Sequence, residues 1–193
     1  MTKDALRQHY LASRQQADTS RLSQACVHVF SQWNNTLFQN KKCIASYKSI
    51  VKFKEFDIAS IEAIILSQFP HIQFVYPTVQ KDIIQFYSDK NDTARWVTNK
   101  WGISEIHDGI SIHPNQIDIV LCPLIVCDLK GYRLGYGKGY YDKYLSQISE
   151  SCVKIGFGIF EPIEHIYADT STDIPLDYYI SPTQVYSFTS RQQ

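Results

Sequence analysis

Apolar residues recur along this chain with two different periods, one typical of helices and the other typical of buried strands. Between residues 20 and 34 the apolar positions are separated alternately by three residues and by one: Leu22, Ala25, Cys26, Val29, Phe30 and Trp33. Such spacing places them on one face of an α-helix. A weaker period over residues 3–17 follows Thr2, whose side chain is of a type that commonly caps helices. We predict a helix over each segment, the second packed against a flat surface.

Two further helices are predicted later in the chain. After Asp57, a potential cap, the segment 58–69 is apolar along one side, and Pro70 marks its end because proline cannot continue a helix. The segment 140–148, YYDKYLSQI, also has a helical pattern.

Runs rich in Val, Ile, Leu and aromatic residues predict strands between these helices. They span residues 43–50, 73–79, 82–88, 118–129, 153–159 and 177–181, and the second and third are close enough in the chain to pair. The run DIVLCPLIVCDL at 118–129 is typical of a strand covered on both faces, and Pro123 places its end near Cys122. This alternation predicts an α/β fold: a single domain over residues 1–193, with a mostly parallel central sheet and helices on both faces, in three layers. In that architecture, ligands bind beyond the C-terminal ends of the strands.

Length and charge narrow the class of protein. A chain of 193 residues is within the usual range for one globular domain, and its 19 basic and 19 acidic residues give a formal net charge of zero. A neutral chain has no overall attraction for nucleic acid or an anionic membrane, so any anion site has to be built locally. No apolar run has the length of a signal peptide core or approaches the roughly 20 residues that span a bilayer. We expect a cytoplasmic protein without nucleic-acid or membrane partners, and a monomer, because no long apolar stripe remains after the helices are packed.

The cysteines are scattered and odd in number, and no two of them form a C-x-x-C pair: Cys26, Cys43, Cys122, Cys127 and Cys152. This pattern is not typical of a metal site or of a disulfide framework. We expect buried thiols that pack as small apolar side chains.

The candidate chemistry is concentrated in one segment, KGYRLGYGKGYYDKYL, residues 130–145. Gly135, Gly137 and Gly139 alternate with aromatic and basic residues between a predicted strand and a predicted helix. Glycines allow the main chain to adopt positive φ and to approach a phosphate, where main-chain N–H groups and the start of a helix favour an anion. Arg133 and Lys138 would add positive charge. The alternative is a tight turn carrying solvated tyrosines. The loop matches neither the Walker A pattern nor the dinucleotide fingerprint.

Two carboxylates are candidate magnesium ligands. Asp142 follows the last glycine by three residues, in the first turn of the predicted helix, and Asp173 lies in a loop between late strands. Beside a polyphosphate, one or two carboxylates commonly hold Mg²⁺ together with water. The alternatives are a favourable interaction of Asp142 with the helix N-terminus and a turn-forming role for Asp173.

Other charged and aromatic residues have structural interpretations when taken alone. Lys3, Arg7 and Arg14 share one face of the first predicted helix and form a solvated stripe in the simplest interpretation. Glu55 precedes a predicted helix, where a capping acid is expected, and Trp101 is expected in the core or on a stacking surface.

The segments YRLGYGKGYYDKYL and DIVLCPLIVCD together resemble the signature of the 5-formyltetrahydrofolate cyclo-ligases, also called methenyltetrahydrofolate synthetases. The similarity runs nearly end to end and includes Lys3, Arg7, Tyr47, Glu55, Pro77, Trp101 and the sequence DIPLD that begins at Asp173. Two positions depart from the family: Ile106 stands where it usually has proline, and Cys127 where it usually has phenylalanine. These departures bear on the local shape of a loop or pocket and leave the charged groups in place.

The resemblance implies an ATP- and magnesium-dependent enzyme that cyclises 5-formyltetrahydrofolate to 5,10-methenyltetrahydrofolate and releases ADP and phosphate. It assigns ATP binding to Lys3, Arg7, Arg133, Leu134, Gly135, Tyr136, Gly137, Lys138, Gly139, Tyr140 and Tyr141, with Lys138 and Arg133 as the catalytic residues. It assigns Mg²⁺ to Asp142 and Asp173, and the folate to Tyr47, Glu55, Trp101 and Tyr140.

Two other functions are compatible with these residues. The tyrosines of the glycine-rich segment could stack the bases of single-stranded RNA, although the neutral net charge and the confinement of the pattern to one loop disfavour this function. A folate-binding protein that has lost turnover is the second, and its only indications are Ile106 and Cys127.

Overall fold

The structure is a computed structural model that describes residues 1–33, 35–81, 83–89, 95–99 and 102–188. Its α-helices are α1 (Lys3–Gln16), α2 (Thr19–Gln32), α3 (Ala59–Gln68) and α4 (Tyr140–Leu145), and its 3₁₀ helices are η1 (Asn35–Phe38), η2 (Val51–Phe53) and η3 (Pro114–Gln116). All four predicted α-helices are present, with α4 shorter than its sequence pattern indicated.

An eight-stranded sheet forms the centre of the molecule, in the order β12-β11-β10-β7-β1-β2-β3-β6. Its strands are β1 (Cys43–Ala45), β2 (Gln73–Gln80), β3 (Ile83–Ser88), β6 (Ile110–Ile112), β7 (Ile119–Cys122), β10 (Val153–Phe157), β11 (Tyr178–Ile180) and β12 (Val185–Ser187). The strands from β11 to β2 are parallel, whereas β12, β3 and β6 join the two ends of the sheet antiparallel. The mostly parallel sheet and the pairing of β2 with β3 are therefore confirmed.

Two small hairpins outside the sheet were not predicted. They are β4 (Arg95–Thr98) with β5 (Ser104–His107), and β8 (Val126–Cys127) with β9 (Arg133–Leu134). The second hairpin divides the long apolar run at 118–129, since β7 ends at Cys122 as Pro123 predicted and the rest of the run turns away from the sheet. The predicted strand at 43–50 is also shorter, because only its first three residues pair.

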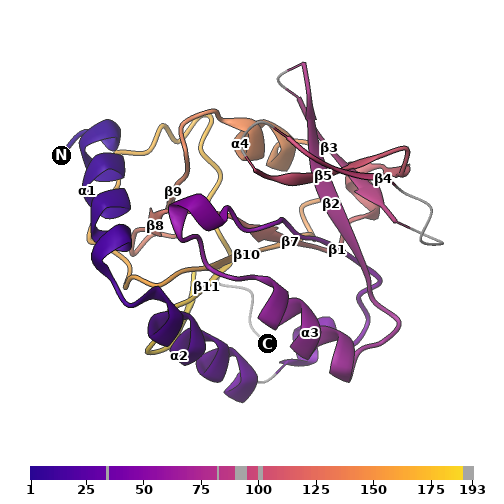
Figure 1. Ribbon diagram of the computed structural model, residues 1–193, viewed down its shortest axis with the longest axis horizontal. Helices are drawn as coiled ribbons and strands as arrows, with labels where there is room; N and C mark the ends of the chain where they lie inside the picture. The colour runs from indigo at the N-terminus through magenta and orange to yellow at the C-terminus, as the bar shows by residue number, and fades with distance from the viewer. Residues whose placement is uncertain (34, 82, 90–94, 100–101, 189–193) are drawn as a thin grey trace.

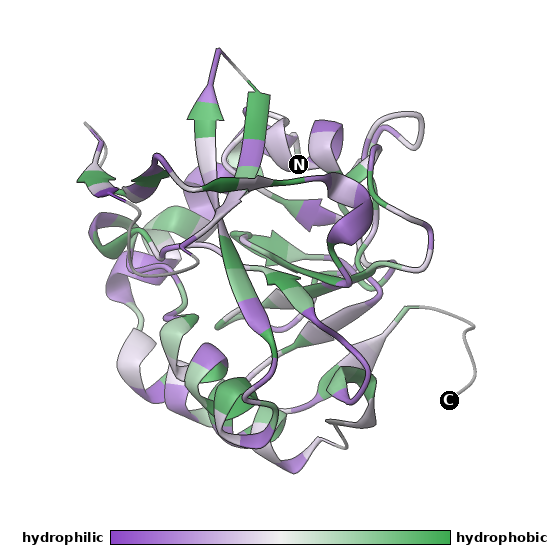
Figure 2. Cartoon of the chain, turned by 90° about the vertical axis from the view of Figure 1, so that its right-hand side faces the viewer, coloured by the Kyte–Doolittle hydropathy of each residue, from purple (hydrophilic) through white to green (hydrophobic). Residues whose placement is uncertain are grey.

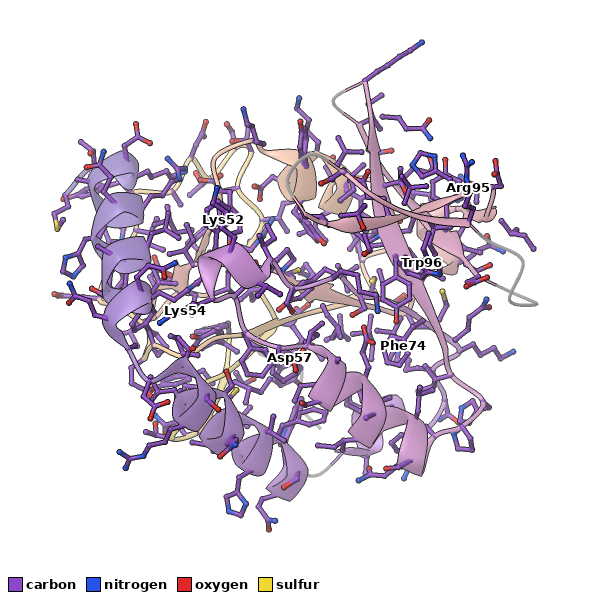
Figure 3. All side chains as sticks on the ribbon, in the orientation of Figure 1. Lys52, Lys54, Asp57, Phe74, Arg95 and Trp96 are labelled. Carbon is purple, nitrogen blue, oxygen red and sulfur yellow. The ribbon has the colours of Figure 1, made fainter. Side chains whose placement is uncertain are left out.

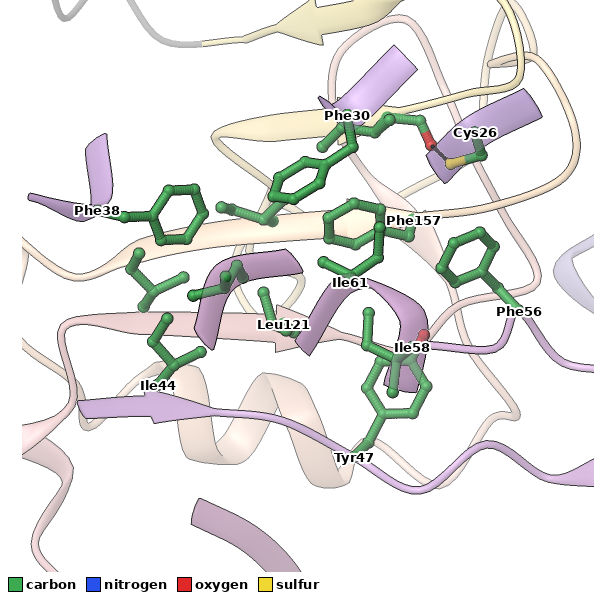
Figure 4. Packing of buried hydrophobic residues seen from close by; sticks show 14 of the residues in the cluster. Cys26, Phe30, Phe38, Ile44, Tyr47, Phe56, Ile58, Ile61, Leu121 and Phe157 are labelled. Carbon is green, nitrogen blue, oxygen red and sulfur yellow. Dashed lines mark hydrogen bonds between the residues drawn. The ribbon is translucent and has the colours of Figure 1, made fainter. Parts of the chain in front are cut away.

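Helices cover both faces of the sheet (Figure 1). The interior on one side, shown in Figure 4, is formed by residues of α2 and α3 packed on alternate residues of β7 and β10, among them Phe30, Ile61, Leu121 and Phe157. On the opposite face, Tyr144 of α4 lies in a second cluster with Val120 and Cys122 of β7. Every residue of β7 is buried, as expected for a strand covered on both faces. In Figure 2 the central strands are accordingly largely green, the colour of apolar residues.

Helix α1 covers neither face of the sheet. It lies at one end of the molecule (Figure 1), where Leu6 packs against Val126 and Leu134 of the β8–β9 hairpin. The Thr2 hydroxyl accepts a hydrogen bond from Ala5 N at 3.2 Å and caps this helix as predicted. Helix α1, which carries Lys3, Arg7 and Arg14, is thus packed against the segment that contains the glycines.

The start of α3 differs from the prediction. Ile58, not Asp57, occupies the N-cap position and makes no side-chain cap. The Asp57 carboxylate still accepts a hydrogen bond from Ala59 N at 3.2 Å, so it satisfies one N–H of the first turn. The helix ends at Gln68, two residues before Pro70.

All five cysteines are buried and free. Burial raises the pKa of Cys43 and Cys122 to about 11 and that of Cys26 and Cys152 to about 12. They are inert packing groups, as the sequence predicted. No helix in the described parts of the chain has the length and apolar character needed to cross a bilayer.

Candidate active site

The candidate site lies where the chain leaves the C-terminal ends of the central strands. Tyr47 follows β1, and the segment after β7 leads through the β8–β9 hairpin into the glycine loop, which we define as residues 133–139. This is the edge at which ligands bind in open α/β sheets.

The glycine loop needs its glycines for different reasons. Gly137 and Gly139 have φ of +90° and +68°, which side-chain-bearing residues rarely adopt. The prediction of positive φ is wrong for Gly135, which is absent from the described glycines with positive φ. An added Cβ at Gly135 would meet no described atom within 4 Å, so its side-chain position faces open space.

Arg7 joins α1 to the glycine loop. Its Nε donates a hydrogen bond to the Gly135 carbonyl oxygen at 2.9 Å, and a Cβ added at Gly137 would lie 3.2 Å from its Cζ. Its guanidinium also pairs with Asp4, one turn earlier in α1. Leu134, at the start of the loop, is buried and packs against Leu6 of α1. The N-terminal helix and the loop therefore form one unit, although they are far apart in the sequence.

The two candidate magnesium ligands are paired with candidate phosphate ligands. Lys3 Nζ lies 2.5 Å from Asp173 Oδ2, and Arg133 donates to Asp142 Oδ1 at 2.9 Å. Arg133 also donates to the Ile174 carbonyl oxygen at 2.6 Å, and Ile174 N donates to Asp142 Oδ1 at 3.2 Å. These bonds bring Asp142 next to the segment that carries Asp173.

The donor set fits magnesium. Within the described residues, no hydrogen bond or ion pair reaches Oδ2 of Asp142 or Oδ1 of Asp173, so each carboxylate keeps one oxygen available. Hard oxygen ligands suit Mg²⁺, which takes one or two protein carboxylates and completes its shell with water and phosphate. The described residues contain no group of three or more His, Cys, Asp or Glu side chains that could form an all-protein cage.

The two candidate catalytic cations differ in environment. Lys138 is exposed at the tip of the loop, and no hydrogen bond or ion pair joins its side chain to another described residue. The Arg133 side chain is only 4% exposed and is held by Asp142 and Ile174. Lys138 is thus free to meet an incoming anion, whereas Arg133 would first have to leave its partner.

Arg14 is the main correction to the predicted solvated stripe. The whole residue is 2% exposed, so its guanidinium lies inside the protein. Its terminal nitrogens donate to the carbonyl oxygens of Leu124 and Ile125 at 2.9 and 3.0 Å and to the Tyr136 hydroxyl at 3.2 Å. Sequence reasoning missed this residue, because helical spacing shows that it shares a face with Lys3 and Arg7 but not that the face is covered.

Glu55 is connected to Arg14 through the Tyr136 hydroxyl, to which both side chains are hydrogen-bonded. It does not cap α3, the role that its position in the sequence indicated. Its Oε1 accepts from the Tyr136 hydroxyl at 2.9 Å and its Oε2 from Ile50 N at 2.8 Å. Burial raises the pKa of Glu55, while the bonds from Ile50 and Tyr136 and the charge of Arg14 act in the opposite direction.

Tyrosine hydroxyls without a partner surround this network. Among the described buried side chains, the hydroxyls of Tyr47 and Tyr141 make no hydrogen bond. The charge of Glu55 contributes to raising the pKa of both, after the larger effect of burial. Unsatisfied buried hydroxyls are uncommon, and here they indicate where polar groups of a ligand could be received.

An aromatic cluster at the end of β1 was also missed. Lys48 Nζ lies 3.9 Å from the ring centroid of Tyr76 and 5.4 Å from that of Trp96, and 3.8 Å from Glu62 Oε2. Figure 3 shows Trp96 on the β4–β5 hairpin, Lys52 on η2 and Lys54 directly after it. The cluster joins a loop residue after β1 to residues of β2, β4 and α3, so no short sequence motif reveals it.

The remaining predicted residues are placed as follows. Tyr140 begins α4 and packs at the edge of the second core cluster. Trp101 lies outside the described residues. Ile106 is buried in β5, where it pairs with Trp96 and its carbonyl oxygen accepts from the Thr78 hydroxyl at 2.8 Å. Cys127 is fully buried in β8. Both departures from the family pattern therefore fall inside hairpins.

The fold and the site together define an α/β protein in which a glycine-rich loop, several cations and two carboxylates meet at the C-terminal edge of the sheet. That combination is typical of phosphoryl transfer from a nucleotide. The sequence profile of the 5-formyltetrahydrofolate cyclo-ligase family matches residues 1–179, and the chain belongs to this family.

Individual relatives extend over nearly the whole chain. A 5-formyltetrahydrofolate cyclo-ligase of Mycoplasma pneumoniae is 32% identical over 187 residues, which cover 94% of this chain and 99% of the relative. The solved structure of Aquifex aeolicus 5,10-methenyltetrahydrofolate synthetase aligns with a TM-score of 0.79 and 26% identity, covering 100% of this chain and 96% of that one. A 5,10-methenyltetrahydrofolate synthetase structure from Mycoplasma pneumoniae aligns with a TM-score of 0.74 and 29% identity, covering 94% and 99%.

Proposed function

We propose that this protein catalyses the ATP-dependent cyclisation of 5-formyltetrahydrofolate to 5,10-methenyltetrahydrofolate, with release of ADP and phosphate. The observation that carries the proposal is the family match over residues 1–179, joined by a full-length relative named for this activity. The site supports it, because Gly135 faces open space and Lys138 has no side-chain partner among the described residues, in a loop whose Tyr136 belongs to a buried polar network suited to a second ligand.

The triphosphate would lie over the glycine loop. Gly135, Gly137 and Gly139 would donate main-chain N–H groups, and the cations on α1, Lys3 and Arg7, would contact the phosphate oxygens. Leu134, Tyr136, Tyr140 and Tyr141 complete the proposed ATP-binding segment. Arg7 already touches the loop through the Gly135 carbonyl, so it needs only a local movement to reach a bound phosphate.

Asp142 and Asp173 would hold Mg²⁺ through their available oxygens. Bound Mg²⁺ would neutralise phosphate charge and favour departure of ADP. Lys3 and Arg133 pair with the other oxygen of each carboxylate, so the metal would not have to displace either cation.

The reaction has to turn a poor leaving group into a good one. The formyl oxygen of the N5 amide attacks the γ-phosphorus, the bond from that phosphorus to the ADP oxygen breaks, and an imidate-like phosphate forms. N10 then adds to the formyl carbon and loses its proton, and the carbon–oxygen bond breaks as phosphate leaves. Lys138 would neutralise the transferred group, assisted by Arg133, and positioning and charge account for most of the expected acceleration.

The folate would occupy the region lined by Glu55 and Tyr47. Among the described residues, Glu55 has one donor on each oxygen and the Tyr47 hydroxyl has no partner. Glu55 can therefore accept further N–H groups from a ligand, and the Tyr47 hydroxyl can bond to a polar atom of it. Tyr140 and Trp101 would contact the flat parts of the molecule. We further propose a cytoplasmic monomer without nucleic-acid or membrane partners, in agreement with the formal net charge of zero.

The decisive test is to mix the protein with 5-formyltetrahydrofolate, ATP and Mg²⁺ and to follow the absorbance band of the methenyl product. We expect the band to grow with one ADP formed per product, and to stay absent without ATP or in excess EDTA. Folate binding without the band would indicate a protein that has lost turnover. Salt-sensitive oligonucleotide binding without ATP hydrolysis would instead support an RNA-binding module.

A further inference from the structure

Arg14 is a buried cation with no carboxylate within 4.0 Å among the described residues. Its NH1 and NH2 groups bond to two carbonyl oxygens and one hydroxyl, and its buried Nε has no partner in the described structure. Burying a charge is unfavourable unless other groups compensate it. Two carbonyl dipoles compensate only part of this charge. The third contact, to the Tyr136 hydroxyl, is therefore the one that could connect Arg14 to a negative charge.

The Tyr136 hydroxyl links Arg14 to Glu55. A hydroxyl has a single proton to donate. Because Arg14 NH1 donates to the Tyr136 oxygen at 3.2 Å, the hydroxyl proton is directed at Glu55 Oε1, 2.9 Å away. The Tyr136 ring is held by stacking on Phe53, with centroids 5.6 Å apart and planes inclined by 27°. The relay from guanidinium to hydroxyl to carboxylate is therefore fixed at each link.

We infer that Arg14 is a positioning residue that acts through the Tyr136 hydroxyl to orient the Glu55 carboxylate toward N–H donors of the folate. The inference rests on the proposed role of Glu55 in folate binding. It assigns Arg14 no contact with either substrate, which separates it from Lys3 and Arg7 on the same helix.

The surroundings of Glu55 support this role. The groups that interact with its charge are Arg14 from α1, Tyr136 from the glycine loop, Tyr47 after β1 and Tyr141 from α4. Arg14 is the one cation of this set, and the hydrogen bonds to Glu55 come from Tyr136 and Ile50. Loss of Arg14 or of the Tyr136 hydroxyl would leave burial to raise the pKa of Glu55 with less opposition.

The test is a double-mutant cycle with Arg14→Lys and Tyr136→Phe. Each single variant should raise KM for 5-formyltetrahydrofolate about tenfold, because the Glu55 carboxylate loses a hydrogen bond or its orientation. KM for ATP should stay within about twofold, because Tyr136→Phe removes only the hydroxyl that faces Glu55 and keeps the main chain and ring of Tyr136 in the proposed ATP-binding segment. The acid limb of the pH profile of kcat/KM should move to higher pH in both, since that profile reports free-enzyme groups. The double variant should resemble Tyr136→Phe alone, because both changes break one relay.

Matched controls are Arg21→Lys and Tyr167→Phe, which make the same chemical changes at exposed positions and should leave these constants unaltered. If Arg14→Lys lowers only the melting temperature, or if the effects of the two changes multiply, Arg14 is merely structural. Should Arg14→Lys not fold, an unmoved acid limb in Tyr136→Phe overturns the inference by itself. A wild-type protein that forms no methenyl product contradicts the proposed function instead.

Discussion

At the scale of single residues, the two carboxylates proposed to bind Mg²⁺ are each paired with a cation before any ligand arrives. Asp142 and Asp173 have comparable side-chain exposure, 27% and 23%, but their partners differ, since Arg133 is 4% exposed and Lys3 31%. Water can replace the partner of an exposed cation, but it reaches a buried one poorly. The two ion pairs should therefore differ in their contribution to stability, even though both carboxylates are proposed to bind the same metal.

We predict that Asp142→Ala lowers the free energy of unfolding by about 2 to 3 kcal/mol, and Asp173→Ala by less than about 1 kcal/mol. The first value lies below that of a fully buried pair because Asp142 is partly exposed. Urea denaturation monitored by circular dichroism measures both. Equal losses for the two variants would show that Arg133 does not depend on Asp142.

Lys138 presents the opposite case, a charge with no structural partner among the described residues. We predict that Lys138→Ala leaves the melting temperature unchanged and lowers kcat by at least about 100-fold, the usual order for removing a group that stabilises transition-state charge. Lys143→Ala removes an exposed lysine from α4 and serves as the control, with kcat near that of the wild type. Unaltered turnover in Lys138→Ala would rule out the assigned role.

At the scale of elements, the glycines of the glycine loop differ in why a larger residue would not be tolerated. Gly137 needs its positive φ and lies against Arg7, whereas Gly135 has neither constraint and faces open space. A methyl group at Gly135 should therefore be neutral for folding and harmful only when a ligand lies against the loop.

We predict that Gly135→Ala keeps the free energy of unfolding within about 0.5 kcal/mol of the wild type and weakens ATP binding at least about tenfold. Gly137→Ala should lose about 1 to 2 kcal/mol through its left-handed backbone, in addition to displacing Arg7. Chemical denaturation and calorimetric titration with Mg-ATP provide the two measurements. If Gly135→Ala bound ATP normally, the triphosphate would not lie over this loop.

The elements that could be predicted from the sequence are those with an apolar pattern sustained over many residues or with a residue, such as proline, that ends them. The stripe of α2 and Pro123 at the end of β7 are examples, since each signal is local. The β8–β9 hairpin has strands of only two residues, too short to show any period, and its formation depends on packing against Leu6 of α1. Tertiary contacts decide such elements, so a single sequence does not reveal them.

The residues of the candidate site also divide into those with a local sequence signal and those that only tertiary contacts bring together. The glycine loop and its neighbours Lys138 and Asp142 are adjacent in sequence, so their pattern is visible as a motif. Arg14 is visible only as one of several cations on a helix, and its burial depends on where that helix docks. The family resemblance supplied Lys3 and Glu55, whose bonds to Asp173 and Tyr136 span long stretches of chain that no local pattern connects.

At the scale of the whole molecule, the buried thiols couple stability to pH. The ordinary thiol pKa is 9.0, and in the folded protein it rises to about 11 for Cys43 and Cys122 and to about 12 for Cys26 and Cys152. Below pH 9 both states keep these protons, so the thiols do not affect the balance. Above pH 9 the unfolded chain loses protons that the native protein retains, and the unfolded state is favoured.

We therefore predict that the free energy of unfolding falls as pH rises from 9 to 11, by about 1.4 kcal/mol per pH unit for each thiol that titrates only when unfolded, with buried tyrosines adding to the slope above pH 10. At pH 8 a disulfide reagent should find no fast thiol in the native protein and all five in guanidinium. Cys26→Ala should reduce the denatured count to four and leave the native rate at zero. A thiol that reacts at once in the native protein would mean that the core opens locally, and Cys43, with 8% exposure, would be the first position to examine by its own alanine variant.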